Sequence, residues 1–173
     1  MKLIYSIHRF DVRLFLGVNS SSMHAHWVQV CRWISHSADG GLYVLLAVGL
    51  FGLEGIDSAL LRVMALAFAV ERPLFFLLKN SCKRNRPQQA IQNFQSVITP
   101  ADRFSFPSGH TSAAFMVATL LAYFWPSLLV VLYLWAVAVG FSRVLLGVHF
   151  PTDTLIGAAL GVSVAFFSLN EIL

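Results

Sequence analysis

Long apolar runs separated by short polar segments dominate this chain. The runs at 59–79, 127–147 and 152–169 approach or reach the length that an α-helix needs to cross a membrane, and shorter runs lie at 41–53 and 112–125. Helices are expected because an isolated strand cannot satisfy its backbone hydrogen bonds in lipid, and the alternation typical of a membrane barrel is absent. The pattern predicts an all-α integral membrane helical bundle of about five to six membrane helices.

The N-terminal part of the chain follows a different pattern. In residues 1–20 basic and apolar positions alternate, which predicts an amphipathic helix lying in the membrane interface. Residues 22–36 fit either a second interfacial helix or a short inserted one, and the segment SADGG then interrupts the pattern. We therefore divide the chain into N-terminal interfacial helices at 1–36 and a membrane-embedded core at 37–173.

Composition supports the membrane assignment and narrows the partners. Of the 173 residues, 57% are hydrophobic and 12% are charged, whereas roughly a quarter are charged in soluble domains. The net charge is +4, but the basic residues are interleaved with membrane-length apolar runs and form no aromatic-basic RNA motif. This favours anionic lipid headgroups over nucleic acid as partners.

The cysteines and the N-terminal histidines carry no metal signature. Cys31 and Cys82 lie far apart, and the His-x-His pair of His24 and His26 has too few neighbouring ligands for a metal site. We expect the cysteines to be small apolar side chains and the histidine pair to lie at the interface.

A tight turn sets the direction of the later helices. The segment WPS at 125–127 is too short for anything else, so the helices on either side of it are antiparallel. The helix from 108 then leaves one membrane face, and the helix ending near 147 returns to it. Residues 79–110 and 142–153 therefore share one face. Small residues in the last helix are expected to let it pack closely on its neighbours: Gly157, Ala158, Ala159 and Gly161.

Three polar clusters meet on that face. They are the stretch from Lys79 to Pro87, the segment PSGH from Pro107 to His110, and the segment SRVLLGVHFPTD from Ser142 to Asp153. Arginine binds phosphate oxygens as a bidentate fork, and the free backbone N–H groups at a helix start accept anions. The candidate phosphate-binding residues are Lys79, Arg86, Ser108, Gly109 and Arg143.

Two histidines in these clusters indicate phosphoryl transfer. One can attack phosphorus while the other protonates the leaving oxygen. Asp153 follows His149 by four residues, and Pro151 between them favours the first turn of a helix. From that turn the carboxylate can orient the imidazole, as in the serine-protease triad. The residues alone leave open whether His110 or His149 attacks, but the pairing with Asp153 favours His149.

These three clusters resemble the signature of the type-2 phosphatidic acid phosphatase superfamily, Lys-x6-Arg-Pro, Pro-Ser-Gly-His and Ser-Arg-x5-His-x3-Asp, complete and in order over about residues 40 to 170. The resemblance implies a metal-independent phosphatase without a cofactor. It implies that His149 is the nucleophile and forms a phosphohistidine, that Asp153 assists it, and that His110 is the acid for the leaving group. Lys79, Arg86, Ser108, Gly109 and Arg143 would hold the phosphoryl oxygens.

Four charged residues lie near the motifs without belonging to their fixed positions. We expect Lys83 and Arg84 to anchor lipid headgroups, as interfacial basic residues commonly do. Glu71 and Arg72 lie within an apolar helix, where charges are usually paired. We favour an ion pair with a neighbouring helix over a role in orienting a cation of the site.

The chemistry predicts a membrane lipid phosphate as substrate, with its tail in the bilayer. Bacterial members of the family that the chain resembles act on several lipid phosphates. Among these we select undecaprenyl diphosphate as the expected substrate, with phosphatidylglycerol phosphate or phosphatidate as alternatives. A non-enzymatic anion or lipid transporter would instead place its charges at mid-membrane on broken helices. We expect a multi-pass protein of the bacterial inner membrane. The basic 79–107 segment points to the cytoplasm by the positive-inside rule, whereas the resemblance favours a periplasmic active site, which we adopt.

Overall fold

The computed structural model describes the backbone of residues 2–19 and 24–173 and the side chains of residues 8–19 and 27–173. The described residues form helices and no strand, which confirms the all-α prediction. In chain order the helices are α1 (Lys2–Asn19), α2 (His24–His36), α3 (Gly40–Glu54), α4 (Ala59–Cys82), α5 (Pro87–Ala90), α6 (Gly109–Phe124), the 3-10 helix η1 (Pro126–Leu128), α7 (Leu129–Leu145) and α8 (Pro151–Ile172).

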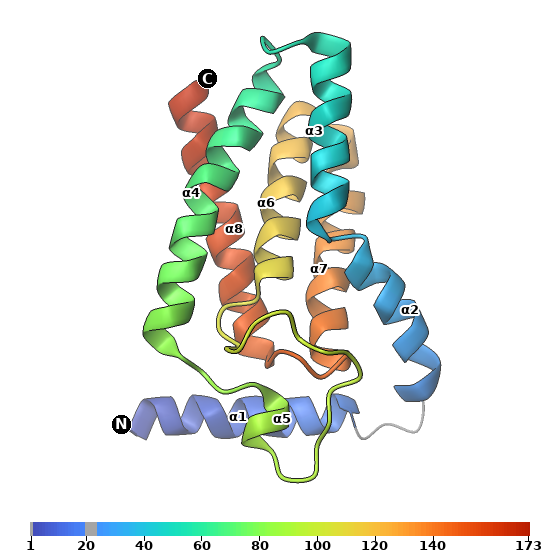
Figure 1. Cartoon of the computed structure of the whole chain (residues 1–173), viewed down its shortest axis with the longest axis vertical. Helices are drawn as coiled ribbons and strands as arrows, with labels where there is room; N and C mark the ends of the chain where they lie inside the picture. The colour runs from blue at the N-terminus through green and yellow to red at the C-terminus, as the bar shows by residue number, and fades with distance from the viewer. Residues whose placement is uncertain (1, 20–23) are drawn as a thin grey trace.

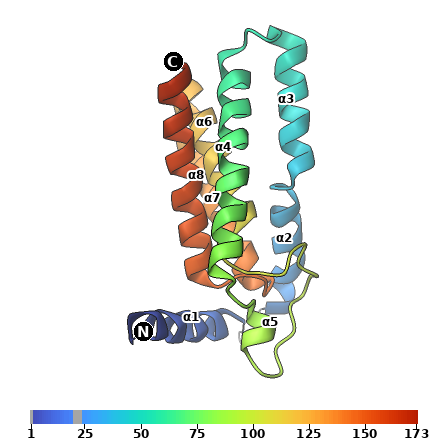
Figure 2. The same ribbon diagram turned by 60° about the vertical axis from the view of Figure 1, so that its left-hand side comes forward.

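Five helices run along the length of the bundle, and one lies across its end. Helices α3, α4, α6, α7 and α8 are aligned with the long axis, while α1 crosses below them (Figure 1). Figure 2 shows the same crosswise orientation of α1 from a second direction, which is how a helix resting in the membrane interface is expected to lie. The His24 and His26 side chains lie outside the described side chains.

The predicted turn at 125–127 is present and sets the polarity of the bundle. Trp125 ends α6, Pro126 opens η1, and α7 returns antiparallel to α6 (Figure 1). The end of α4, the start of α6, the end of α7 and the start of α8 therefore lie at one end of the bundle, together with α5 and α1. This confirms that residues 79–110 and 142–153 share one face.

The outer surface of the bundle is apolar, as lipid contact requires. Exposed large apolar side chains on α3, α7 and α8 include Leu45, Val48, Phe51, Val130, Val131, Leu134, Leu155 and Phe166. Two described segments, Pro126–Leu145 and Pro151–Ile172, are long and apolar enough to cross a membrane, and a third is present if the bent pair Trp27–His36 and Gly40–Glu54 forms one span. Length and composition thus support fewer spans than the five to six expected, because α6 is short and α4 carries charges along its length.

Glycines bring α8 directly against the backbone of α6, as predicted. A Cβ atom at Gly157 would lie 2.6 Å from the carbonyl oxygen of Ser108, and one at Gly161 would lie 2.1 Å from that of Ser112. Both distances are far below van der Waals contact, so only glycine permits this separation of the two helices. Since α6 and α8 carry His110 and Asp153, their close packing also fixes the distance between these two parts of the site.

We expect Gly161→Ala to lower the free energy of unfolding by about 1–3 kcal/mol, because the backbone oxygen of Ser112 can yield only if α6 and α8 move apart. Thermal unfolding in detergent measures the effect. Gly49→Ala is the matched control, since a Cβ there meets nothing within 4 Å; it should be neutral or slightly stabilising because alanine favours helix. Equal unfolding temperatures for the two variants would contradict the packing argument.

Helix α1 is attached to the underside of the bundle by an aromatic contact. Phe15 is fully buried and meets the ring of Phe150 with a centroid separation of 5.5 Å, in a cluster with Val144. Asn19 adds a hydrogen bond to the Val144 carbonyl oxygen at 3.3 Å. The interfacial helix is therefore packed onto the loop that carries His149.

Candidate active site

A single cavity of about 830 Å³ joins the polar clusters to the apolar interior of the bundle. At one end it is lined by Lys79, Arg86, His110, Arg143 and His149. It continues between α3 and α4, where its apolar lining includes Val44, Ala47, Leu61, Met64, Ala65 and Phe68. From Lys79 to Leu61, α4 rises by about 27 Å, which approaches the thickness of the hydrocarbon core. The cavity thus has a cationic end and a long apolar arm.

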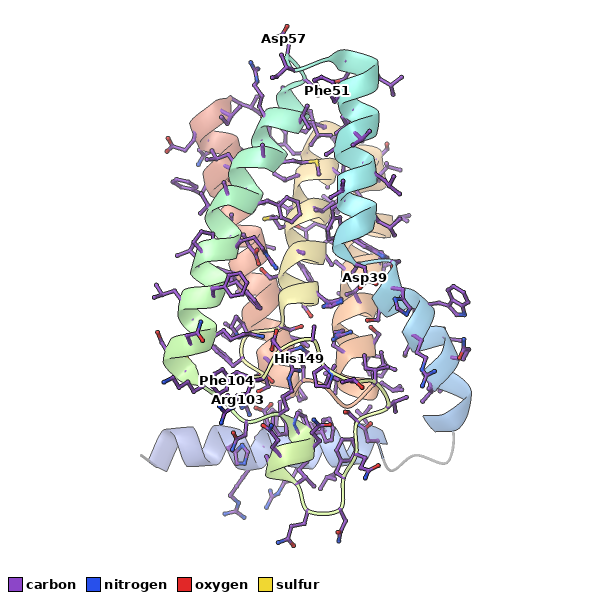
Figure 3. All side chains as sticks on the ribbon, in the orientation of Figure 1. Asp39, Phe51, Asp57, Arg103, Phe104 and His149 are labelled. Atoms are coloured by element: carbon purple, nitrogen blue, oxygen red, sulfur yellow. The ribbon has the colours of Figure 1, made fainter. Side chains whose placement is uncertain are left out.

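His149 lies in the loop between α7 and α8, and Asp153 lies in the first turn of α8, as predicted. Figure 3 shows His149 at the site end of the bundle. Pro151 is the first residue of α8, and His149 is 2% exposed. The distance from His149 Nδ1 to Asp153 Oδ2 is 3.9 Å, which is longer than a hydrogen bond. Asp153 Oδ2 accepts a hydrogen bond from the backbone N–H of Phe150 at 2.8 Å. The pair is therefore in electrostatic range, and Nδ1 has no hydrogen-bond partner among the described residues.

Burial controls the protonation of His149. Removal from solvent lowers the pKa of its imidazole to about 4, and the positive charges of Arg86 and Arg143 act in the same direction. The ring is consequently neutral at pH 7, with a lone pair available for attack on an electrophile.

The neutral form of His149 should persist as the pH falls, because a lowered pKa is crossed only under more acidic conditions. We expect ¹⁵N signals of a histidine-labelled sample to show the His149 ring titrating with a midpoint near pH 4, with His149→Ala used to assign its signals. A His149 midpoint near 6.5, the ordinary value for histidine, would contradict the effect of burial.

Lys79 and Arg86, the two cations of the first motif, both bind the carboxylate of Asp102, a residue that no motif identifies. Lys79 Nζ lies 2.8 Å from both oxygens of Asp102, and Arg86 Nη2 lies 2.6 Å from Oδ1. Although burial opposes ionisation, these hydrogen bonds hold the pKa of Asp102 below its usual value. Asp102 is therefore an anion bound by the residues predicted to bind phosphate, which shows that they are arranged to hold oxygens of an anion.

Arg143 reaches the site from the last turn of α7. Its side chain is 5% exposed, and Nη1 donates to Ser35 Oγ of α2 at 2.6 Å. Its Nε has no hydrogen-bond partner among the described residues. Arg143 therefore keeps a donor group at the cationic end of the cavity, which it lines.

The segment PSGH opens α6, with differences in detail from the prediction. Ser108 is the N-cap residue, but its hydroxyl lies 2.9 Å from Thr111 Oγ1 rather than capping a backbone N–H. The backbone N–H of Ser108 donates to the Asp153 carbonyl oxygen at 3.0 Å. Gly109 packs closely against the ring of Phe75, because a Cβ there would lie 3.0 Å from that ring, which would have to shift by a few tenths of an ångström.

His110 also has a carboxylate partner outside the motifs. Its Nε2 lies 3.0 Å from Asp39 Oδ1, and Asp39 Oδ2 lies 2.8 Å from Nδ1 of the exposed His36. Burial opposes ionisation of Asp39, but the hydrogen bonds with the two histidines hold its pKa below the ordinary value. Asp39 lies between α2 and α3 (Figure 3), so its partnership with α6 depends on tertiary packing that no motif spacing reveals.

Arg84 does more than the headgroup anchoring expected of it. Its Nη1 donates to Asp153 Oδ1 at 2.8 Å and its Nη2 donates to Asp11 Oδ2 of α1 at 2.6 Å. Asp11 and Asp153 are both fully buried, and the Arg84 guanidinium also lies 4.5 Å from the Phe150 ring centroid. The expectation is wrong because it considered only the basic character of the segment. Lys83 is exposed, as an anchoring residue would be.

Glu71 and Arg72 pair with each other instead of with a neighbouring helix. Arg72 Nε donates to Glu71 Oε2, and Ser112 Oγ of α6 donates to Glu71 Oε1 at 2.6 Å. Glu71 is fully buried, so both of its oxygens are satisfied across the α4–α6 contact. The ion pair between Glu71 and Arg72 therefore lies within α4. The contact of Glu71 with the neighbouring helix α6 is a hydrogen bond from the uncharged hydroxyl of Ser112.

The fold and the cavity define a helical membrane protein with a buried site of cations and histidines at one end. The model of the PAP2 superfamily matches residues 58–171, so the chain belongs to this superfamily. The match contains all three clusters.

Named relatives and solved structures agree with this placement. The chain is 37% identical over 136 residues to phosphatidylglycerophosphatase B of Bacillus subtilis, which covers 72% of the chain but 63% of that protein. It is 30% identical over 163 residues to decaprenylphosphoryl-5-phosphoribose phosphatase of Mycobacterium tuberculosis, covering 90% and 87%. The crystal structure of a PAP2 type phosphatidylglycerolphosphate phosphatase from Bacillus subtilis superposes with a TM-score of 0.81 at 30% identity, over 96% of this chain and 86% of that one.

Proposed function

We propose that this protein is a bacterial membrane lipid phosphatase that releases a terminal phosphate through a phosphohistidine intermediate. The observation that carries the proposal is the cavity itself: it joins two histidines and three cations to an apolar arm between α3 and α4. A phosphorylated lipid matches both parts, since its headgroup needs cations and its chain needs an apolar environment. A transporter is disfavoured because Lys79, Arg86, His110, Arg143 and His149 lie at helix ends or in loops.

In the proposed first step, His149 Nε2 attacks phosphorus, because Nδ1 faces Asp153. The P–N bond forms as the bond from phosphorus to the lipid oxygen breaks, and that oxygen takes a proton from His110. Asp153 stabilises the positive charge that develops on the attacking imidazole. Lys79, Arg86, Ser108, Gly109 and Arg143 bind the phosphoryl oxygens. This requires the phosphate to replace the Asp102 carboxylate on Lys79 and Arg86, and the Ser108 hydroxyl to turn from Thr111 toward the cavity.

The second step returns the protein to its starting state. His110, now neutral, accepts a proton from water, whose oxygen attacks the phosphohistidine. The P–N bond breaks, inorganic phosphate is released, and the His149 lone pair is restored. The bonds and protons balance with groups of this chain and one water, without a metal or cofactor, when His110 begins each cycle protonated. Burial and the charge of Arg143 lower the pKa of His110 to about 4, so the Asp39 carboxylate at 3.0 Å and the bound anionic phosphate must together keep it protonated.

The substrate assay compares three lipids in detergent with excess chelator: undecaprenyl diphosphate, phosphatidylglycerol phosphate and phosphatidate. We expect phosphate release from at least one, with undecaprenyl diphosphate the first candidate from the sequence resemblance. Phosphatidylglycerol phosphate is supported by the name of the relative at 37% identity. Activity that appears only after a divalent metal is added, or no release from any lipid phosphate, would contradict the proposal.

We propose a periplasmic position for the site in the bacterial inner membrane. Gln92 is exposed in the segment after α5, at the site end of the bundle. Both natural cysteines are free and Cys82 is exposed, so it must be removed first. A Gln92→Cys variant in a Cys82→Ser background should react with a membrane-impermeant maleimide in intact spheroplasts. Labelling only after lysis would place the site in the cytoplasm.

A further inference from the structure

Part of the cavity beyond the phosphoryl site is lined by two hydrogen-bond donors that have no partner among the residues the structure describes. Tyr43 of α3 is 7% exposed, and its hydroxyl is buried with no hydrogen-bond partner among the described residues. Arg72 of α4 binds Glu71 through Nε, while its Nη2 is likewise buried and has no such partner. Both residues line the cavity. A buried polar group without a partner is costly, so this pair points to a ligand that supplies acceptor oxygens.

These donors lie on the tail side of the phosphoryl site. Arg72, Phe75 and Lys79 are spaced i, i+3 and i+7 and therefore occupy one face of α4. The Phe75 ring lies between the two cations, 4.8 Å from the Arg72 guanidinium carbon and 4.5 Å from Lys79 Nζ. Phe75 is buried and lines the cavity, as do apolar residues further along α4 such as Phe68 and Met64. A lipid headgroup at Lys79 must pass Arg72 before its chains reach the apolar arm.

The nearby carboxylates do not occupy these donors. Both oxygens of Glu71 are bound, by Arg72 Nε and Ser112 Oγ, and both oxygens of Asp39 are bound by histidines. Tyr43 and Arg72 line the same cavity from the facing helices α3 and α4, so one ligand group in that cavity can reach both donors. An arginine fork beside a phenol hydroxyl is suited to an oxyanion.

We propose that Arg72 and Tyr43 form a second anion subsite that binds an internal phosphodiester of the substrate. This inference rests on the proposed function, because it assumes that the scissile phosphate lies at Lys79 and Arg86. The two phosphates of a diphosphate share a bridging oxygen, whereas those of a phosphoglycerol headgroup are separated by a carbon spacer. The Phe75 ring separates the two cations as the carbon spacer separates the two phosphates. The subsite therefore selects lipids with a terminal phosphomonoester and a separate phosphodiester, and it favours phosphatidylglycerol phosphate over undecaprenyl diphosphate, the first candidate from the sequence resemblance.

Tyr43→Phe is the most direct test, because it removes a hydroxyl that has no partner in the described structure and should leave the fold intact. The readout is the ratio of kcat/KM for phosphatidylglycerol phosphate to that for phosphatidate, which lacks the second phosphate but keeps the ester carbonyls. We expect this ratio to fall about threefold to tenfold. The double variant Glu71→Gln/Arg72→Gln, which avoids leaving a buried charge alone, should lower it at least about tenfold. Arg62→Gln, on the exposed face of the same helix, is the control and should leave the ratio unchanged.

A binding measurement separates this proposal from the proposed function. Phosphatidylglycerol keeps only the internal phosphodiester, so a fluorescent short-chain form should bind the wild-type protein more tightly than the matching diacylglycerol, and Tyr43→Phe should remove the difference. Equal binding in wild type and variants, or equal loss of activity on both substrates, would overturn the subsite. If phosphatidylglycerol binds through Tyr43 while no lipid is hydrolysed, the subsite is supported and the proposed phosphatase function is contradicted. If Tyr43→Phe lowered kcat/KM for undecaprenyl diphosphate as much as for phosphatidylglycerol phosphate, the proposed selection for a carbon spacer between the phosphates would be overturned.

Discussion

Replacing His149 by alanine is expected to reduce phosphate release by at least about 10⁴-fold, because the proposed reaction has no path around the nucleophile. The residual rate would come from the cations and the acid, which still bind and polarise the phosphate. The effect should fall on kcat far more than on KM, since His149 acts in bond formation while Lys79, Arg86 and Arg143 remain to hold the headgroup. Inorganic phosphate is measured in detergent with excess chelator.

Three further measurements make the result specific to the nucleophile. Acid-labile ³²P labelling of the protein should be detectable in the wild type after rapid quenching and absent in His149→Ala. The fold should survive, because His149 Nδ1 has no hydrogen-bond partner among the described residues to lose. His36→Gln is the control: this histidine is exposed and reaches the site through Asp39, so we expect less than a tenfold change. Equal activity of His149→Ala and wild type would remove His149 from the mechanism.

Much of the site could be predicted because its residues lie at the ends of successive apolar helices, whose positions relative to the membrane follow from the sequence. Once a tight turn fixes the direction of α6 and α7, a residue at the end of one apolar run must share a membrane face with the start of the next. That reasoning placed His110, Arg143 and His149 together, and Pro151 placed Asp153 in the first turn of α8. Periodicity and turn chemistry are local, so they survive folding unchanged.

The partners of these residues could not be predicted in the same way. Asp11, Asp39, Arg84 and Asp102 lie on α1 or in polar connections, where no hydrophobic period or motif spacing fixes which way a side chain points. Their contacts span long sequence separations and depend on how α1 and the 91–108 segment fold over the end of the bundle. The number of spans was also hard to judge, because Glu71 and Arg72 are tolerated in α4 only through contacts made in the folded state.

Arg84→Gln is expected to lower kcat by about 100-fold with little change in KM, because Arg84 holds Asp153 but does not line the cavity. Without the guanidinium, Asp11 and Asp153 remain as two fully buried carboxylates with no shared cation, and the position of Asp153 beside His149 is no longer fixed. Breaking such a buried pair also costs about 3–5 kcal/mol of stability. Phosphate-release kinetics and thermal unfolding measure the two effects separately.

The double variant Asp11→Asn/Arg84→Gln distinguishes a positioning role from a purely structural one. Neutralising Asp11 removes one of the two stranded carboxylates, so much of the lost stability should return. Activity should stay low, because Asp153 still lacks the donor at Oδ1 that orients it. Arg84→Lys, which keeps the charge, should recover part of kcat, and Lys83→Gln at the adjacent exposed position should change neither quantity. If activity instead returns in parallel with stability in the double variant, Arg84 only supports the fold, and the interfacial helix α1 has no direct influence on the nucleophile.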